Sequence, residues 1–280
     1  MSMSEQRSVR PLLAQARGKR SGCTVAHSEV PGKRPRRVAA IRAKQAWELD
    51  NTTSSLVYEA ESNCTAAVIW LHGLDDTPEP WANRLAAERR RRPTWKWVHL
   101  RAPERPITCY NRKMHSAWGD FVDGEKLRVG SKDHNSDDPK GWFAESVALV
   151  HSTVASLEAE GVPARNIAIV GFSQGAALAA QAALTLTSTP LGGWGMLSGW
   201  LPKRARQQLS QSANGRNGAR VLICHSPTDE EVDMGCARLA SKLLNAAGSE
   251  VEFKQLEDTM HIGTAAAGQR HALAFLDEIL

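Results

Sequence analysis

The sequence of 280 residues predicts an α/β fold with a mostly parallel central sheet and helices on both faces. Two observations support this prediction. From about residue 55 onward, short apolar runs alternate with stretches of helical character. The apolar runs are typical of strands that are buried on both faces. Alternation of strands and helices implies parallel strands joined by right-handed crossovers.

The first half of this region predicts two strands, a helix and a long insertion. The strands and the helix are residues 66–71, 95–100 and 81–92. Residues 101–140 are polar and rich in Pro and Gly, so we expect a loop-rich insertion. A helix over residues 142–160 follows. Gly161 and Pro163 mark its end, because Gly favours the helix terminus and Pro cannot continue the helix.

The second half continues the alternation without an internal repeat. Strands are predicted at residues 166–170, 194–197, 220–224 and 251–256. Helices are predicted at residues 174–186, 236–247 and 264–279. Residues 55–280 are therefore expected to form a single domain that follows a leader of residues 1–54.

The leader differs from the rest of the chain in charge. Residues 1–45 contain 11 Lys and Arg but only two acids, a net charge of +9, and the remainder carries −4. Nucleic-acid binding by the folded region is therefore not expected, although the leader could contact an anionic surface. Its composition fits either a disordered arm, which leaves the protein in the cytoplasm, or an organelle-targeting peptide.

The cysteines and the apolar runs exclude several other classes of protein. The cysteines are five in number and show no C-x-x-C pair or Cys/His cluster: Cys23, Cys64, Cys109, Cys224 and Cys236. Neither a zinc site nor a disulfide framework is predicted, and a reducing compartment fits best. No apolar run is long enough to cross a membrane, and no secretory signal is visible near the start.

The strongest local motif is the segment Gly171–Gly175, which fits the pattern G-x-S-x-G. An apolar strand precedes it and an Ala-rich helix follows it, which is the context of a nucleophile elbow. We therefore predict that Ser173 is a nucleophile on a strained strand-to-helix turn. A Cβ atom on either flanking glycine would collide with the neighbouring strand or helix. The alternative is a tight turn that contains a serine by chance.

A serine hydroxyl needs a base, and in this fold the acid and the histidine follow the serine in the chain. Asp229 follows the strand of residues 220–224 by a few positions, and His261 follows the last strand in a loop. Both lie where parallel strands end, so we expect them to meet Ser173. Three other residues compete for these roles. Asp233 lies further from the strand end, His225 lies directly at the strand end, and His271 lies inside a predicted helix.

Attack on a carbonyl also needs two N–H donors for the developing oxyanion. The N–H of Gln174 lies at the predicted start of a helix, next to the nucleophile. The second donor should come from a loop after an early strand, and Leu74 is assigned because Gly73 frees the backbone there. The alternative is an ordinary turn at the end of that strand.

Several blocks together resemble the acyl-protein thioesterase family, which is also called the phospholipase/carboxylesterase family and has the α/β-hydrolase fold. The similar segments are LHGLDDT at 71–77, RAPERPITCY at 101–110, GVPARNIAIVGFSQGAAL at 161–178 and LSGWLP at 197–202. The resemblance implies a triad of Ser173, Asp229 and His261, with Leu74 and Gln174 as oxyanion donors. This sequence departs from the family pattern at Asp75 and Met260, where the family has glycine.

The resemblance implies hydrolysis of palmitoyl and related acyl thioesters on S-acylated proteins, and of acyl-ester lipids, without a cofactor or metal. Trp118 is a candidate wall of the acyl pocket, because an acyl chain needs an apolar lining. Membrane contact is expected to be peripheral at most, and the oligomeric state is left open. Two alternatives remain: a broad carboxylesterase or lysophospholipase without a protein substrate, and a catalytically silent binding protein on a hydrolase scaffold.

Overall fold

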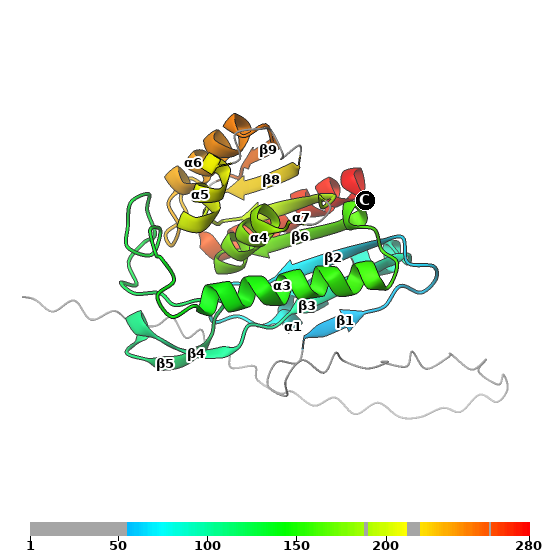
Figure 1. Cartoon of the computed structure of the whole chain (residues 1–280), viewed down its shortest axis with the longest axis horizontal. Coiled ribbons are helices and arrows are strands. Elements are labelled where there is room, and N and C mark those ends of the chain that lie inside the picture. Colours follow the sequence, from blue (N-terminus) through cyan, green and yellow to red (C-terminus); the bar gives the residue numbers. More distant parts are fainter. Residues whose placement is uncertain (1–54, 188–189, 212–218, 258) are drawn as a thin grey trace, which may run out of the picture. The chain divides into compact units, whose positions relative to one another are not determined.

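Seven strands form one central sheet within the described residues of the computed structural model, which are 55–187, 190–211, 219–257 and 259–280 (Figure 1). The strand order is β1-β3-β2-β6-β7-β8-β9, and every neighbouring pair in this sheet is parallel except β1 and β3. The strands are β1 (Leu56–Tyr58), β2 (Ala66–Leu71), β3 (Trp95–Leu100), β6 (Ile167–Phe172), β7 (Gly193–Leu197), β8 (Arg220–His225) and β9 (Glu250–Gln255).

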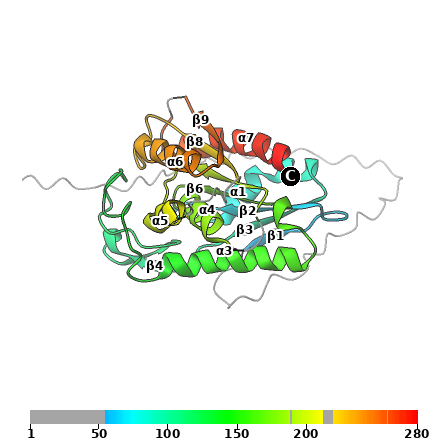
Figure 2. The ribbon, with the colours of Figure 1, turned by 45° about the horizontal axis from the view of Figure 1, so that its top comes forward.

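Helices cover both faces of this sheet (Figures 1 and 2). One face carries α1 (Pro78–Arg84) and α7 (His261–Ile279). The opposite face carries α3 (Trp142–Ala159), α4 (Gln174–Thr185), α5 (Lys203–Gln211) and α6 (Met234–Ala246). The predicted α/β fold is therefore confirmed.

The central strands are apolar throughout because alternate residues enter different cores. In β2, Ile69 packs in a cluster with residues of α3 and α4, whereas Trp70 packs in a second cluster with Trp81 of α1 and Phe275 of α7. Successive side chains of a strand point to opposite faces, so a strand between two helical layers needs apolar residues at every position. All six residues of β2 are at most 1% exposed.

The register of the sheet aligns the carboxyl ends of its parallel strands. Leu71 of β2 pairs with Gly171 of β6, and Leu197 of β7 pairs with Cys224 of β8. The loops that follow β2, β6, β7, β8 and β9 therefore leave the sheet at one edge. Ligand sites of open α/β sheets form at this edge.

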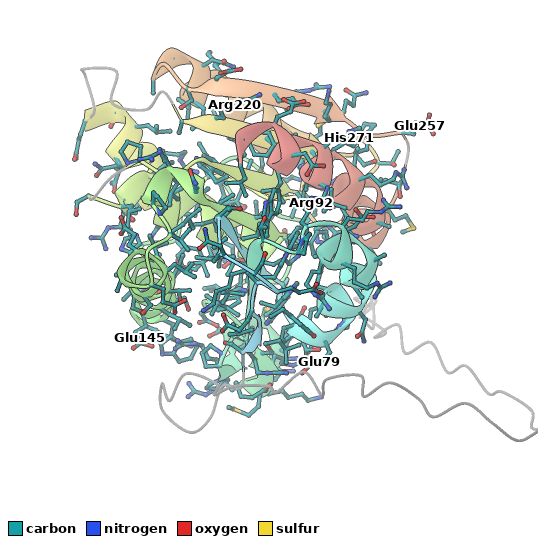
Figure 3. All side chains as sticks on the ribbon, turned by 90° about the vertical axis from the view of Figure 1, so that its right-hand side faces the viewer. Glu79, Arg92, Glu145, Arg220, Glu257 and His271 are labelled. Atoms are coloured by element: carbon teal, nitrogen blue, oxygen red, sulfur yellow. The ribbon has the colours of Figure 1, made fainter. Side chains whose placement is uncertain are left out.

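The predicted helix over residues 81–92 is instead two short helices, α1 and α2 (Ala86–Arg91). Leu85 interrupts them with ψ of 0°, and it is fully buried. Tertiary contacts redirect the second helix: the Arg89 guanidinium lies 3.6 Å from the centre of the Tyr58 ring. Arg92 donates to Asp277 of α7, with 2.6 Å between Nε and Oδ1, and Figure 3 labels it beside that helix. Such contacts override the helix propensity of the Arg run.

The insertion at residues 101–140 contains a hairpin that the sequence did not predict. Its strands β4 (Glu104–Ile107) and β5 (Lys113–Ser116) form a separate two-stranded antiparallel sheet. Pro106 lies opposite Met114 in this pair. A proline is tolerated in such an edge strand, because one side of the strand has no partner that needs its N–H.

The insertion is hydrogen-bonded to two loops at the carboxyl edge of the sheet. The N–H of Asp75, after β2, donates to Ser116 O at 2.8 Å. Leu127 N donates to Glu231 O at 2.8 Å, and Asp233 N donates to Leu127 O at 2.9 Å, so Leu127 and Val232 form a parallel bridge. The insertion thus contacts both the loop after β2 and the loop after β8.

His99 of β3 is a buried titratable group that is not part of this edge. Its side chain is 0% exposed, and neither ring nitrogen has a hydrogen-bond partner within the described residues. The ring lies edge-on to Tyr58, with 5.9 Å between centroids. Burial lowers the pKa of His99 to about 3. The folded protein therefore excludes a proton that the unfolded chain binds below about pH 6.5.

We expect His99→Leu to make the protein less sensitive to acid. Because the folded pKa lies below the unfolded pKa, His99 costs stability as pH falls through about 6.5, and the loss levels out near pH 3. At pH 5 this cost is about 2 kcal/mol relative to neutral pH. Urea unfolding at pH 7.5 and pH 5 measures it, and the data at pH 7.5 serve as the control. An equal loss of stability in both proteins would contradict the assignment.

Candidate active site

Ser173 lies on the turn between β6 and α4, as the motif predicts. Its φ and ψ are 54° and −119°, a strained conformation for a residue with a Cβ atom. Its N–H donates to Leu197 O at 2.9 Å, and its carbonyl accepts from Ala176 N at 3.0 Å. These bonds fix the backbone of the turn between two strands and a helix.

The two glycines that flank Ser173 are sterically required. A Cβ on Gly171 would lie 2.1 Å from the carbonyl oxygen of Gly175 in α4. A Cβ on Gly175 would lie 2.3 Å from His72 O and 2.4 Å from Leu71 O at the end of β2. The predicted collisions with a neighbouring helix and strand are confirmed, and they hold Ser173 on a strand-to-helix turn with the geometry of a nucleophile elbow.

Asp229 and His261 are brought together from the ends of β8 and β9. His261 Nδ1 lies 3.0 Å from Oδ1 and 2.9 Å from Oδ2 of Asp229. Both side chains are buried, with 1% of Asp229 and 7% of His261 exposed. Since a carboxylate only accepts, the imidazole carries its proton on Nδ1, which leaves Nε2 free to act as a base.

The Asp229 carboxylate is stabilised as an anion despite its burial. Burial alone would raise its pKa, but hydrogen bonds from His261 and Ser198 outweigh this effect and hold the pKa of Asp229 below its usual value. Oδ1 also accepts from the backbone N–H groups of Glu231 and Val232, each at 2.9 Å. A buried carboxylate with this many donors orients a histidine and stabilises its charged form.

His261 lies against the elbow but is not hydrogen-bonded to Ser173. Its ring packs on Phe172, with 4.8 Å between centroids. Within the described residues, no hydrogen bond joins the Ser173 hydroxyl to His261 or to any other group. Such bonds are often long in the absence of substrate and shorten when substrate binds. The structure thus forms the Asp229–His261 pair beside Ser173, and the bond between Ser173 and His261 stays a prediction.

The competing residues have other roles. Asp233 caps α6 by accepting from Gly235 N at 2.8 Å. His225 is fully buried, its Nε2 bonds Val232 O at 2.9 Å, and burial lowers its pKa. His271 lies ten residues beyond His261 on α7, about 15 Å along the helix, and Figure 3 shows it on that helix.

The loop after β2 lies against the nucleophile. A Cβ on Gly73 would come 3.5 Å from the Ser173 Cβ, so Leu74 is one residue from direct contact with the elbow. Asp75, the next residue, has φ of 57° in place of the family's glycine, and its carboxylate contacts His115 Nδ1 at 2.9 Å. The N–H of Gln174 begins α4, where no helical carbonyl can accept it. Both predicted oxyanion donors therefore lie in segments next to Ser173.

Trp118 lies below this loop rather than on an open surface. Its side chain is 0% exposed, and its Nε1 donates to His72 O at 2.8 Å. Its backbone N–H donates to Oε1 of Gln174 at 2.7 Å. Trp118 thus supports the segments that carry Leu74 and Gln174 from the core, and it is not among the residues that line the neighbouring cavity.

That cavity, of about 420 Å³, lies between the insertion, α4 and α5. Apolar groups line part of it, notably Phe121, Phe143 and Trp200, and Gln174 borders it. Four aspartates also line it: Asp120, Asp133, Asp137 and Asp138. Burial raises the pKa of Asp133 to about 6. The volume of the cavity is in the range of small-molecule sites, but its lining combines apolar and charged side chains.

Two residues near the triad were not identified from the sequence. Ser198 contacts both Asp229 and His261, and the exposed Glu230 accepts from His261 N at 2.7 Å. This last bond caps α7, which begins at His261 and not at Thr264 as predicted. Ser198 belongs to the segment LSGWLP, which resembles the family but does not by itself assign a role to the serine. No local pattern marks Glu230, because its partner is 31 residues away.

The described part of the chain holds no group of three or more His, Cys, Asp or Glu residues that could bind a metal ion. Its helices are also too short or too polar to span a membrane. The leader of residues 1–54 lies outside the described residues.

The sheet order and the nucleophile elbow define an α/β hydrolase. The chain belongs to the phospholipase/carboxylesterase family, whose sequence model matches residues 52–276. It is 32% identical to carboxylesterase SOBER1 of Arabidopsis thaliana over 190 residues, which cover 67% of this chain and 79% of that protein. It is 30% identical to acyl-protein thioesterase 1 of Gibberella zeae over 204 residues, which cover 71% and 84%.

Solved structures agree with these relationships. The crystal structure of Arabidopsis thaliana SOBER1 matches with a TM-score of 0.66 and 28% identity, covering 77% of this chain and 99% of that one. The structure of Zea mays acyl-protein thioesterase 2 matches with a TM-score of 0.58 and 25% identity, covering 79% and 98%. The predicted family is therefore confirmed, and the chain is an ester hydrolase of this family.

Proposed function

We propose that this protein is a serine hydrolase that cleaves long-chain acyl thioesters, such as S-palmitoyl groups on proteins, and related carboxylic esters. The observation that carries the proposal is the buried Asp229–His261 pair packed beside the strained Ser173 turn. A relative named acyl-protein thioesterase supports the thioester part. S-acylated proteins or acyl-ester lipids would be the substrates, with no cofactor, metal or nucleic acid.

The proposed reaction proceeds through an acyl-serine intermediate. Ser173 Oγ attacks the carbonyl carbon while His261 Nε2 takes its proton, and Asp229 stabilises the resulting imidazolium. The N–H groups of Leu74 and Gln174 stabilise the oxyanion. The C–S or C–O bond then breaks, and the leaving group takes the proton from His261. Water then attacks the acyl-serine carbonyl while His261 Nε2 takes a proton from the water. The bond between the acyl carbon and Ser173 Oγ breaks, Ser173 Oγ regains a proton from His261, and the carboxylic acid leaves.

The cavity beside Gln174 is the proposed acyl site. Phe121 and Trp200 line it and pack edge to face, with 5.8 Å between ring centroids. These rings provide the apolar surface that an acyl chain needs. Trp118 belongs to the support of this site, since it is buried behind Gln174.

The four aspartates of the same cavity favour a second candidate, a broad carboxylesterase or lysophospholipase without a protein substrate. Carboxylates are unfavourable neighbours for a long alkyl chain but tolerate a short or polar acyl group. The two candidates share the same triad and differ only in the substrate.

Comparison of acyl substrates tests the proposal. We expect a palmitoylated peptide thioester to have a higher kcat/KM than a short-chain nitrophenyl ester. Phe121→Ala should lower kcat/KM for the palmitoyl substrate about tenfold, because it removes apolar contact area, and should change the short ester little. Val129→Ala, at an exposed residue outside the cavity lining, is the control. A preference for the short ester that Phe121→Ala leaves unchanged would favour the second candidate.

We also propose that the protein acts in the cytoplasm, with at most peripheral membrane contact. Four cysteines in the described residues are free, Cys64, Cys109, Cys224 and Cys236, which suits a reducing compartment. Organelle targeting by the basic leader is the alternative. Imaging of the full chain and of a chain without residues 1–45 distinguishes the two.

A further inference from the structure

Ser198 lies directly after β7, between the strand ends that carry Ser173 and Asp229. Its N–H donates to Cys224 O of β8 at 2.8 Å. Its φ is 52°, in the left-handed region that residues with a Cβ atom rarely adopt, and it is 0% exposed. Strained and fully buried polar residues of this kind are concentrated at functional sites.

The Ser198 hydroxyl contacts both members of the buried pair. Its Oγ donates to Oδ2 of Asp229 and lies 3.2 Å from Nδ1 of His261. Because Nδ1 carries a proton toward the carboxylate, it has no lone pair that could accept from Ser198. The hydroxyl proton must therefore go to Asp229, and the three groups form a closed triangle.

We propose that Ser198 is a positioning residue for the triad: its hydroxyl holds the Asp229 carboxylate against His261 and tunes how readily His261 accepts the proton of Ser173. This inference rests on the proposed function, because it assigns a role within the same site. Ser198 would not touch the substrate, and it would act through Asp229.

The consequence for catalysis follows from the hydrogen bonds that the two carboxylate oxygens of Asp229 accept. Without the hydroxyl, Oδ1 keeps the N–H groups of Glu231 and Val232, but Oδ2 keeps only His261. A carboxylate with fewer donors attracts the imidazolium more strongly. The base is then protonated up to a higher pH, so the acid limb of the kcat/KM profile moves upward.

The other charged or titratable groups that face this triangle make contacts that do not involve the Ser198 hydroxyl, so we expect them to stay in place when Ser198 is replaced. Nε2 of His225 lies 3.6 Å from Oδ2 of Asp229, and burial lowers the pKa of His225. Lys126 Nζ donates to Asp229 O at 2.5 Å, and Glu230 accepts from His261 N. A shift of the acid limb in a Ser198 variant is therefore attributable to the lost hydroxyl.

Two substitutions separate this role from a structural one. Ser198→Ala removes the hydroxyl and keeps the left-handed strain, whereas Ser198→Gly removes the hydroxyl and relieves the strain. Ser198→Gly is therefore expected to be the more stable of the two proteins. Ser249→Ala is the matched control, because Ser249 is a buried serine whose hydroxyl has no partner within the described residues.

We expect both Ser198 variants to lose about tenfold in kcat, with little change in KM, because the Asp229 carboxylate is no longer held against His261 and the imidazole is less well oriented toward Ser173. The acid limb of kcat/KM should move up by about half a pH unit in both. Ser249→Ala should leave both quantities unchanged. An unchanged kcat and acid limb in both Ser198 variants would overturn the inference. Recovery of wild-type activity in Ser198→Gly, in step with its thermal stability, would also overturn it and leave a structural role.

Rejection of the positioning role of Ser198 is distinguishable from rejection of the proposed function. If Ser173 is not the nucleophile, Ser173→Ala retains turnover, whatever the Ser198 variants do. If Ser173→Ala is inactive and both Ser198 variants keep wild-type profiles, only the role of Ser198 is rejected.

Discussion

Ser173→Ala is expected to abolish ester and thioester hydrolysis while the protein remains folded. The substitution removes the proposed nucleophile, and loss of this group typically costs about 10⁴-fold or more in kcat. Folding should persist because the Ser173 hydroxyl makes no hydrogen bond within the described residues, and the backbone bonds of the turn do not depend on it. Alanine has the same steric difficulty at φ of 54° as serine, so the strain is unchanged.

Turnover assays and fluorophosphonate labelling of the purified proteins measure this effect. The wild-type protein should be labelled and Ser173→Ala should not, with equal thermal unfolding midpoints. Ser152→Ala, at an exposed serine of α3, is the control and should be labelled like the wild type. Turnover in pure Ser173→Ala protein would reject Ser173 as nucleophile. A wild-type protein that is neither labelled nor active would favour the catalytically silent binding protein.

Gly175→Ala is expected to destabilise the fold by about 3–5 kcal/mol, enough to remove most of the folded protein. The added Cβ would lie 2.3 Å from His72 O and 2.4 Å from Leu71 O, and both are backbone atoms. Neither can move easily, because Leu71 pairs with Gly171 in the middle of the sheet. Relief would require α4 to shift away from β2, which would also displace Ser173.

Gly195→Ala provides the matched control for this prediction. Gly195 lies in β7 of the same sheet, but the three atoms nearest to its added Cβ would all belong to the Val170 side chain, the closest at 3.4 Å. We expect it to change the free energy of unfolding by less than about 1 kcal/mol. Soluble yield and urea unfolding measure both variants. Similar stabilities for Gly175→Ala and Gly195→Ala would show that the elbow adapts to a side chain.

The strands and the elbow were predictable because their signals are local. Residues 66–71 and 95–100 match β2 and β3, since a fully buried strand shows as an uninterrupted apolar run. The elbow adds a motif with a fixed steric requirement to such a run. Asp229 and His261 were predictable from the ends of β8 and β9, because parallel strands bring their carboxyl ends to the same edge.

The missed features depend on contacts between distant segments. The bend between α1 and α2 places Arg89 on the Tyr58 ring, 31 positions earlier in the chain, and no helical pattern encodes this contact. The sequence does not predict the β4–β5 hairpin, because proline and polar residues dominate this segment. Ser198 showed only as part of a motif, since its φ and its bond to Asp229 appear only when β7 and β8 are adjacent.

The position of Trp118 is another feature that depends on contacts between distant segments, and it concerns the residues that determine substrate specificity. A tryptophan near a motif suggests an apolar wall, but the sequence does not say whether the ring faces the cavity or the core. Its Nε1 donates to His72 O and its backbone N–H donates to Gln174 Oε1, and these bonds hold Trp118 inside the protein. The cavity rings Phe121 and Trp200 come from segments about 80 residues apart, so only the folded chain brings them together.

The insertion is hydrogen-bonded to the loop after β2 through Asp75 and Ser116, and to the loop after β8 through Leu127 and Glu231. It cannot be treated as an exchangeable module that sets substrate choice alone. A chimera that receives this segment from a relative would also receive different anchors for the loops that carry Leu74 and Asp229, and we expect its turnover to change together with its selectivity. Engineering of acyl preference in this protein should therefore use single substitutions in the cavity rather than loop transplantation.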